Sequence, residues 1–155
     1  MIVFLVRHAH AIDERRDLPD PARPLSATGR TQARALGQRL RWHDCTPTAL
    51  WTSPLTRTVM TAELVAAALD WAGPIDSVPA LAPDGRIGDV VAALAAVDPA
   101  STIVMFGHEP GISGLGVRLT GDPHFAPLAK AEAVRIDGRA IRWRFAHDDE
   151  APRPP

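Results

Sequence analysis

An apolar run at the start of the chain, residues 2–6, constrains the fold more than any other feature of the sequence. The run is rich in β-branched residues and stops at Arg7 and His8, which is the pattern of a buried strand with polar groups at its carboxyl end. Strands that are apolar throughout occur mainly in parallel sheets that are covered on both faces. In such sheets, ligands bind beyond the carboxyl ends of the strands. We therefore expect Arg7 and His8 to lie at a binding site.

Two other segments show a similar pattern. Residues 48–52 form a short strand-like run that ends at Ser53, and residues 102–106 form a clearer apolar run that leads to His108. Pro54 directly follows Ser53, which is typical of a helix whose N-cap is serine and whose first residue is proline. Because the carboxyl ends of parallel strands meet at one edge of a sheet, we expect all three runs to deliver polar residues to one pocket.

The remaining segments complete an α/β pattern. A helix is expected to begin at Ser26 or Thr28 as N-cap and to continue to about residue 42. Further elements are expected as helices at about 55–69, 87–97 and 111–119, a weak strand at 75–78, and a hairpin of 131–136 and 140–145 around an Asp-Gly turn.

This order of elements predicts a single α/β domain, residues 1–146. We expect a three-layer sandwich, in which a mostly parallel sheet carries helices on both faces and has one antiparallel edge. Residues 147–155 are expected to form a disordered tail.

The composition fits a globular protein that folds without disulfides or metal ions. The chain has 155 residues, of which 46% are hydrophobic and 23% charged, and its formal net charge is -1. A net charge this close to zero produces no overall electrostatic attraction to nucleic acid or to an anionic membrane, so neither is an expected partner. The single cysteine, Cys45, excludes an internal disulfide and suits a reducing compartment. The first apolar run is too short for a signal peptide, and no segment has the roughly 18 apolar residues of a membrane span. We expect a cytoplasmic protein.

The expected pocket is cationic and contains two imidazoles. The residues that would meet there are Arg7, His8, Arg57 and His108. The N-termini of two helices would join them, and their unpaired N–H groups favour anions. Phosphate fits this set best, because arginine binds it with two parallel hydrogen bonds and fixed guanidinium groups can stabilise a transferring phosphoryl group. A neutral imidazole of one histidine could attack phosphorus, while the other imidazole, protonated, stabilises the transferring group.

Four motifs in this chain follow predicted strands or precede predicted helices. They are Arg7-His8, Arg23-Pro24-Leu25-Ser26 before Gly29, Ser53-Pro54-Leu55-Thr56-Arg57 followed by Thr61-Ala62-Glu63, and Gly107-His108-Glu109-Pro110. In this order the motifs resemble the histidine phosphatase superfamily, over residues 1 to about 145. The resemblance implies that His8 is the phosphorylated nucleophile. It also implies that Arg7, Arg57 and His108 form the phosphate pocket around it.

The chain is short and lacks the long insertions that cap the phosphoglycerate mutases. Its size and its Arg-Pro-Leu-Ser and Leu-Ala-Pro-Asp-Gly stretches are most similar to the small phosphohistidine phosphatases of the SixA type. Larger members of the superfamily carry a glutamate after the third strand as proton donor, and the matching loop here offers Asp84 as a candidate general acid or nothing. Arg23 and His10 are candidate substrate contacts, while Thr61 and Glu63 are expected to be ordinary helical residues.

Two alternatives to a phosphohistidine enzyme remain open from the sequence. His8 and His10 lie on one side of an extended segment, as in some zinc hydrolases, but a metal would need further ligands and would be repelled by Arg7 and Arg57. The second alternative is a module that binds phosphate without turnover.

The predicted activity is a metal-independent phosphatase, without a cofactor, that acts on phosphohistidine in proteins and releases inorganic phosphate. An alkoxide leaves poorly unless an acid protonates it, whereas the imidazole of a phosphohistidine leaves with little help. Small phosphomonoesters, such as sugar or glycerate phosphates, are the alternative substrates. A short chain with little to cover the pocket also favours a bulky protein substrate.

Overall fold

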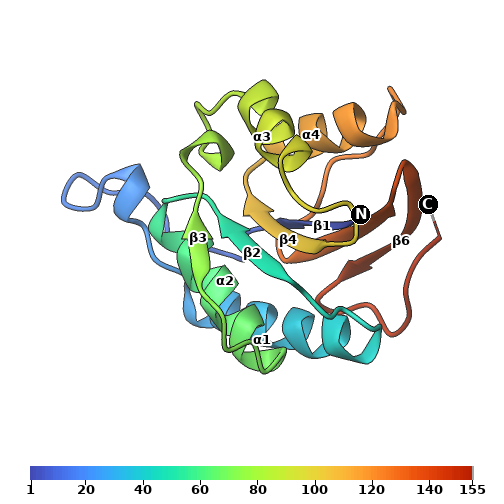
Figure 1. Cartoon of the computed structure of the whole chain (residues 1–155). Coiled ribbons are helices and arrows are strands. Elements are labelled where there is room, and N and C mark those ends of the chain that lie inside the picture. Colours follow the sequence, from blue (N-terminus) through green and yellow to red (C-terminus); the bar gives the residue numbers. More distant parts are fainter. Residues whose placement is uncertain (155) are drawn as a thin grey trace.

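One six-stranded sheet forms the centre of the protein, with the strand order β3-β2-β4-β1-β5-β6 (Figure 1). The computed structural model describes residues 1–154. The strands are β1 (Ile2–Arg7), β2 (Ala49–Thr52), β3 (Ile75–Ser77), β4 (Thr102–Gly107), β5 (Glu132–Asp137) and β6 (Ala140–Ala146). The helices are α1 (Ala27–Trp42), α2 (Thr56–Ala68), α3 (Ile87–Ala95) and α4 (Gly111–Thr120), together with the short 3-10 helices η1 (Asp20–Ala22) and η2 (Pro79–Leu81).

The pairing of the strands determines which residues reach the same edge of the sheet. Strands β3, β2, β4 and β1 pair in parallel, whereas β5 and β6 are antiparallel to their neighbours. Arg7 at the end of β1 lies opposite Gly107 at the end of β4, and the N–H of His8 donates to the carbonyl of Gly107 at 3.1 Å. His8 and His108 therefore directly follow the paired ends of two neighbouring strands, at the same edge of the sheet.

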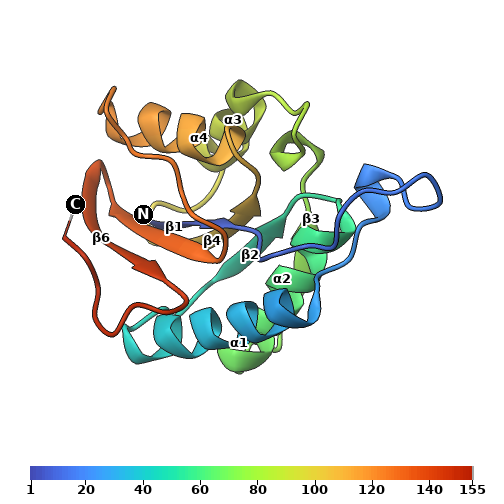
Figure 2. The same ribbon diagram turned by 180° about the vertical axis from the view of Figure 1, so that it is seen from behind.

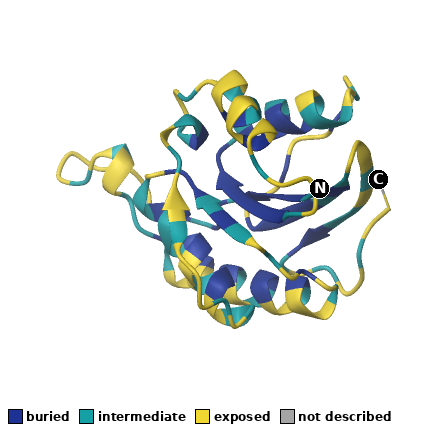
Figure 3. Cartoon of the chain, in the orientation of Figure 1, coloured by how far each residue is buried: buried dark blue, intermediate teal, exposed yellow. Residues whose placement is uncertain are grey.

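Helices cover both faces of the sheet. Helices α1 and α2 lie on one face, and α3 and α4 lie on the other (Figures 1 and 2). Alternate side chains of β1 enter two separate cores: Phe4 and Val6 pack on the side of α1 and α2, whereas Val3 and Leu5 pack on the other side. Figure 3 shows the buried residues along the sheet and on the inner faces of the helices. The predicted three-layer α/β sandwich with an antiparallel edge is confirmed.

The start of α1 packs closely against the segment that follows His8. Ser26, rather than Thr28, is the N-cap, and its Oγ accepts a hydrogen bond from the N–H of Gly29 at 3.0 Å. A Cβ atom on Gly29 would lie 1.9 Å from the carbonyl oxygen of His10. Only glycine permits this approach. Ser26 and Gly29 therefore allow the start of α1 to pack against the segment that follows β1.

The start of α2 differs from the prediction. The helix begins at Thr56 with Leu55 as N-cap, so the prediction of Ser53 as N-cap and Pro54 as first helical residue is wrong. Ser53 is fully buried, and its Oγ lies 2.8 Å from Nε2 of His108. The hydroxyl contacts a side chain that is distant in sequence, and a local capping pattern cannot reveal such a partner.

The segment after β6 also differs from the expected disorder. Arg153 and Arg144 exchange backbone hydrogen bonds at 2.8 and 2.9 Å, and the guanidinium of Arg153 binds Glu132 at 2.9 Å. Glu132 is almost completely buried and pairs with both arginines, so Arg153 is held beside β6. Pro155 lies outside the described residues. Within residues 1–154, no helix is long and apolar enough to cross a membrane.

Candidate active site

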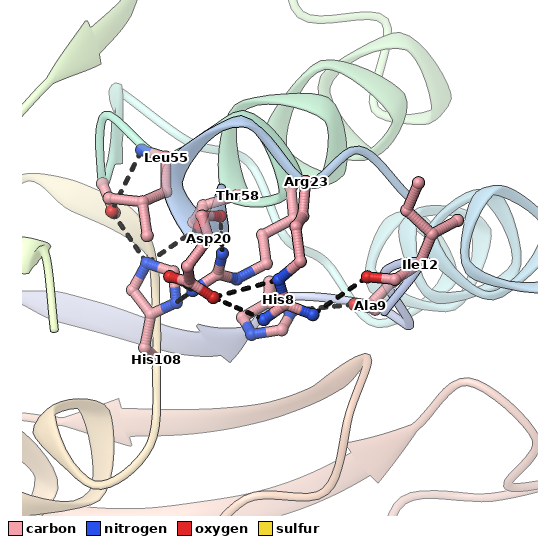
Figure 4. A network of polar contacts seen from close by, with 10 residues as sticks. His8, Ala9, Ile12, Asp20, Arg23, Leu55, Thr58 and His108 are labelled. Carbon is pink, nitrogen blue, oxygen red and sulfur yellow. Dashed lines mark hydrogen bonds and ion pairs between the residues drawn. The ribbon is translucent and has the colours of Figure 1, made fainter. Parts of the chain in front are cut away.

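The carboxyl ends of β1, β2 and β4 meet at one polar cluster (Figure 4). The rings of His8 and His108 lie with their centres 5.0 Å apart, and the guanidinium of Arg57 reaches His108 at 3.4 Å. Arg7 precedes His8 on β1, and its charge acts on both imidazoles. The structure thus brings together all four residues that the sequence predicts for a phosphate pocket.

The ring of His8 is held in one orientation with one nitrogen unprotonated. Its Nδ1 lies 2.7 Å from the carbonyl oxygen of Ala9. Because a carbonyl can only accept, Nδ1 carries the proton and the neutral ring keeps a lone pair on Nε2. Burial lowers the pKa of His8 from 6.5 to about 4, the hydrogen bond to Ala9 opposes this shift, and the charges of Arg57, Arg7 and Lys130 add to it. At neutral pH, His8 is therefore an uncharged imidazole with a free Nε2, as a nucleophile requires.

His108 is fixed by partners on both ring nitrogens. Arg57 donates from Nη2 to Nδ1, so Nε2 carries the proton and faces the hydroxyls of Ser53 at 2.8 Å and Thr58 at 3.0 Å. Burial lowers the pKa of His108 to about 3; the charges of His8, Arg57 and Arg7 lower it further, and Asp20 opposes them. The structure therefore holds His108 neutral, whereas the sequence predicts a protonated second histidine. A bound phosphate dianion would favour protonation, because opposite charge stabilises the imidazolium.

The two arginines provide buried donors. Arg57 is the second residue of α2 and is only 4% exposed. The Nε atoms of Arg7 and Arg57 are buried and have no hydrogen-bond partner within residues 1–154. Arginine binds a tetrahedral anion through parallel N–H donors, and the N-terminus of α2 adds its positive dipole end. These donors suit a phosphoryl group.

Asp20 is a residue of the site that the sequence does not reveal. From η1, it accepts hydrogen bonds from Arg57 through its carbonyl oxygen at 2.8 Å and its Oδ2 at 3.1 Å (Figure 4). Burial opposes its ionisation, but the hydrogen bonds and charges of Arg23 and Arg57 hold the pKa of the Asp20 carboxyl below its ordinary value. The loop that carries Asp20 is rich in charge and proline and shows no periodic pattern, so no local signal singles out this carboxylate.

Arg23 lies next to the pocket and is joined to it through Asp20. Its Nε and Nη2 donate to Oδ1 of Asp20 at 3.0 and 2.6 Å, and its Nη1 donates to the carbonyl of Ile12 at 2.9 Å. These bonds join the two ends of the loop between β1 and α1. Arg23 therefore remains a candidate substrate contact.

Thr61 connects the strand that carries His8 to the helix that carries Arg57. Its buried Oγ1 accepts a hydrogen bond from the N–H of Ala9 at 3.1 Å and donates to the carbonyl of Arg57 at 2.7 Å. This role differs from the ordinary helical position expected from the sequence. The only sequence signal is a threonine one turn after Arg57, and that spacing is common on helices.

The sequence comparison identifies the family of this chain. The model of the histidine phosphatase superfamily (branch 1) matches residues 3–83, which is more than half of the chain. The protein belongs to the histidine phosphatase superfamily. An uncharacterized protein of Picosynechococcus sp. is 32% identical, and the match covers 97% of this chain and 93% of that protein.

Solved structures show how widely this histidine phosphatase fold is shared. The protein histidine phosphatase SixA, solved with tungstate, superposes with a TM-score of 0.87 at 22% identity, over 95% of this chain and 97% of that one. A mycobacterial glucosyl-3-phosphoglycerate phosphatase, solved with VO3, has a TM-score of 0.69 at 19% identity, over 92% and 96% of the two chains. The fold is therefore common to proteins named for quite different phosphorylated substrates.

His10 helps to position α1 in this histidine phosphatase. Its Nδ1 lies 2.8 Å from Oγ of Ser26, and its N–H donates to the side chain of Gln32 at 3.0 Å. One ring nitrogen of His10 is thus engaged by Ser26. Within the described residues, no group of three or more His, Cys, Asp or Glu side chains is arranged to hold a metal ion.

Asp84 lies in the exposed turn between η2 and α3. It lines a groove of about 460 Å³ together with residues that include Leu55 and Arg86. Asp84 has no hydrogen bond or ion pair to His8 or His108 in residues 1–154. Its assignment as general acid therefore stays a prediction.

Proposed function

We propose that this protein is a phosphatase that forms a covalent phosphohistidine on His8 and acts on phosphohistidine side chains of proteins. The observation that carries the proposal is the hydrogen bond from Nδ1 of His8 to the carbonyl of Ala9 at 2.7 Å. This bond leaves Nε2 free on a neutral ring, beside the guanidinium groups of Arg7 and Arg57. A free imidazole nitrogen among fixed cations is what nucleophilic attack on a phosphoryl group needs.

The reaction proceeds in two displacements. The lone pair of Nε2 of His8 forms a bond to phosphorus, and the bond from phosphorus to the leaving group breaks with its electron pair on the leaving group. Water then attacks the phosphorus, the P–N bond breaks, and the electron pair returns to Nε2. Inorganic phosphate leaves, and the proton lost by the attacking water passes to solvent or to the released group. Arg7 and Arg57 stabilise the oxygens of the transferring group in both steps, so the proposal needs no metal ion.

His108 supports the same steps from the side of β4. Arg57 and the hydroxyls of Ser53 and Thr58 hold its ring beside that of His8. In the proposal it binds the phosphoryl group and gains a proton when the dianion is present. A fixed donor of this kind contributes most where charge develops in the transition state.

The substrate preference follows from the carboxylates near the pocket. Asp20 contacts the pocket, but Arg23 and Arg57 stabilise its ionised form, and this makes it a poor proton donor. Asp84 lies in an exposed groove. Without an efficient acid, an imidazole or phenol leaves much faster than an alkoxide. This supports phosphohistidine over sugar or glycerate phosphates, although the shared fold is compatible with either.

The proposal is tested by the turnover of three substrates. We would measure kcat/KM for a phosphohistidine peptide, p-nitrophenyl phosphate and an alkyl phosphate, in the parent protein, Asp84→Asn and Asp20→Asn. The first two substrates should be hydrolysed far better than the third, and EDTA should leave the rates unchanged. Efficient turnover of the alkyl phosphate that collapses in Asp84→Asn would identify Asp84 as general acid and contradict the phosphohistidine preference.

The covalent step has its own test. Rapid quench with labelled substrate should trap acid-labile, base-stable phosphate on the parent protein and none on His8→Ala. Turnover in His8→Ala should fall by roughly 10³-fold or more, as for other nucleophile deletions. His124→Ala, at an exposed histidine outside the pocket, is the matched control and should behave as the parent. Tight phosphate binding with no turnover of any substrate would instead favour a recognition module.

A further inference from the structure

The direction of the Arg7 guanidinium depends on a segment far from its own strand. Its Nη1 donates to the carbonyl oxygen of Leu128 at 2.8 Å. Leu128 is 1% exposed and lies in the connection between α4 and β5, outside any helix or strand. Because its carbonyl is not part of a regular ladder, its position must be fixed by other contacts.

Glu109 supplies the contact that fixes Leu128. Its Oε1 accepts the N–H of Leu128 at 2.8 Å, and its Oε2 accepts the hydroxyl of Ser113 at 2.5 Å. Ser113 lies in the first turn of α4, and Glu109 directly follows His108 at the end of β4. One carboxylate therefore joins the strand end that carries His108, the start of α4 and the segment that receives Arg7. Both of its oxygens are used.

We propose that Glu109 is a positioning residue for Arg7, acting through the backbone of Leu128. The inference rests on the proposed role of Arg7 in binding the phosphoryl group. Without the carboxylate, the N–H of Leu128 loses its acceptor and the carbonyl that orients Arg7 is free to shift. Displacing a catalytic group by about 1 Å can reduce activity as much as a hundredfold. Glu109 does not touch the phosphoryl group in this proposal; it determines where Arg7 points.

The test is the affinity for tungstate, a phosphate analogue whose binding needs no turnover. Glu109→Leu should weaken tungstate binding by roughly tenfold or more and reduce kcat/KM for p-nitrophenyl phosphate to a similar extent. Glu109→Gln should restore most of the affinity, because its amide oxygen still accepts from Leu128 and its amide nitrogen can donate to Ser113. Glu63→Leu removes the same charge at an exposed position of α2 and should change neither quantity.

A double-mutant cycle separates positioning from a general effect on the fold. In an Arg7→Ala background, Glu109→Leu should cause no further loss of tungstate affinity, because the residue that it positions is absent. An equal loss in both backgrounds would overturn the inference, and so would a lower Tm in Glu109→Leu with unchanged tungstate affinity.

Ser113→Ala is a milder variant that frees one oxygen of Glu109 and should give a smaller loss of tungstate affinity. If the parent binds tungstate but hydrolyses nothing, the proposed function fails while this test still holds; if the parent does not bind tungstate, both fail.

Discussion

The imidazole rings of His8 and His108 lie 5.0 Å apart, centre to centre, with their planes inclined by 56°. They follow the neighbouring strands β1 and β4, and the register that pairs Arg7 with Gly107 brings them to the same level. Each ring has a fixed partner on its Nδ1: a backbone carbonyl for His8 and the guanidinium of Arg57 for His108. The pair is therefore pre-organised and uncharged before any phosphate binds.

This arrangement predicts an acid limit for activity. The pKa of His8 is lowered to about 4, so its Nε2 stays unprotonated well below the range of an ordinary histidine. We expect kcat/KM for p-nitrophenyl phosphate to show no loss from protonation of His8 at pH 6 and to fall as the pH approaches about 4. A half-maximal value near pH 6.5 would show that His8 titrates as an exposed histidine and would contradict the burial argument.

The same lowered pKa predicts how stability depends on pH. An unfolded chain has His8 at its ordinary pKa of 6.5, so between about 4 and 6.5 the unfolded state binds more protons than the folded state. The stabilisation from keeping His8 neutral is fully present above pH 6.5 and is lost as the pH falls through the pKa of the folded state. We expect the free energy of unfolding to decrease by up to about 3 kcal/mol over this range. Urea unfolding should show a steeper slope in the parent than in His8→Asn. His108, whose pKa is lowered to about 3, contributes a slope of at least similar size that is common to both proteins.

Removing Arg57 should affect the transition state strongly. Arg57→Ala deletes a buried guanidinium at the start of α2. We expect kcat/KM to fall by the equivalent of about 3 kcal/mol of transition-state stabilisation, the scale of one well-placed donor. Inhibition by phosphate, vanadate and tungstate should weaken in parallel. Arg34→Ala, at an exposed arginine of α1, is the control. A loss of only a few tenths of a kcal/mol at Arg57 would show that its guanidinium does not stabilise the transition state.

Asp20 should oppose anion binding. Its carboxylate neutralises part of the charge of Arg57, and an incoming phosphoryl group must compete with it. Asp20→Asn should therefore raise the affinity for tungstate by roughly fivefold, about 1 kcal/mol for removal of one like charge in a hydrated pocket. The carbonyl of Asp20 remains to hold Arg57 in place. Asp17→Asn in the same loop is the control, and weaker tungstate binding in Asp20→Asn would show that the carboxylate is needed to orient Arg57.

Thr61 should contribute to stability and activity together. Thr61→Val keeps the shape but leaves the N–H of Ala9 and the carbonyl of Arg57 without their buried partner. We expect the free energy of unfolding to fall by about 2 kcal/mol, with a lower kcat/KM because His8 and Arg57 lose a common support. Thr31→Val removes a hydroxyl that also bonds the carbonyl four residues earlier, on the exposed side of α1, and should be nearly neutral. Equal effects at Thr61 and Thr31 would contradict this role.

Much of the fold and of the site could be predicted from local patterns. The apolar runs of β1 and β4 are buried strands because they lack charge over their whole length, and each run stops where a histidine follows. Parallel strands are joined by crossover connections, which here contain helices. The carboxyl ends of these strands therefore lie at one edge of the sheet. Arg7, His8, Arg57 and His108 could therefore be assigned to one pocket from their positions relative to predicted elements.

Other features depend on contacts between segments that are distant in sequence, and only the tertiary structure decides them. Ser53 looks like a helix N-cap, but a buried imidazole from β4 is its partner. Asp20 lies in a loop without periodicity, and its two arginine partners become neighbours only when that loop folds over α2. Hydrophobic periodicity indicates which face of an element is buried, whereas a hydrogen bond between distant segments produces no repeating pattern in the sequence. The sequence by itself thus determined the sheet and the residues at its edge, and the folded chain determined which partners hold them.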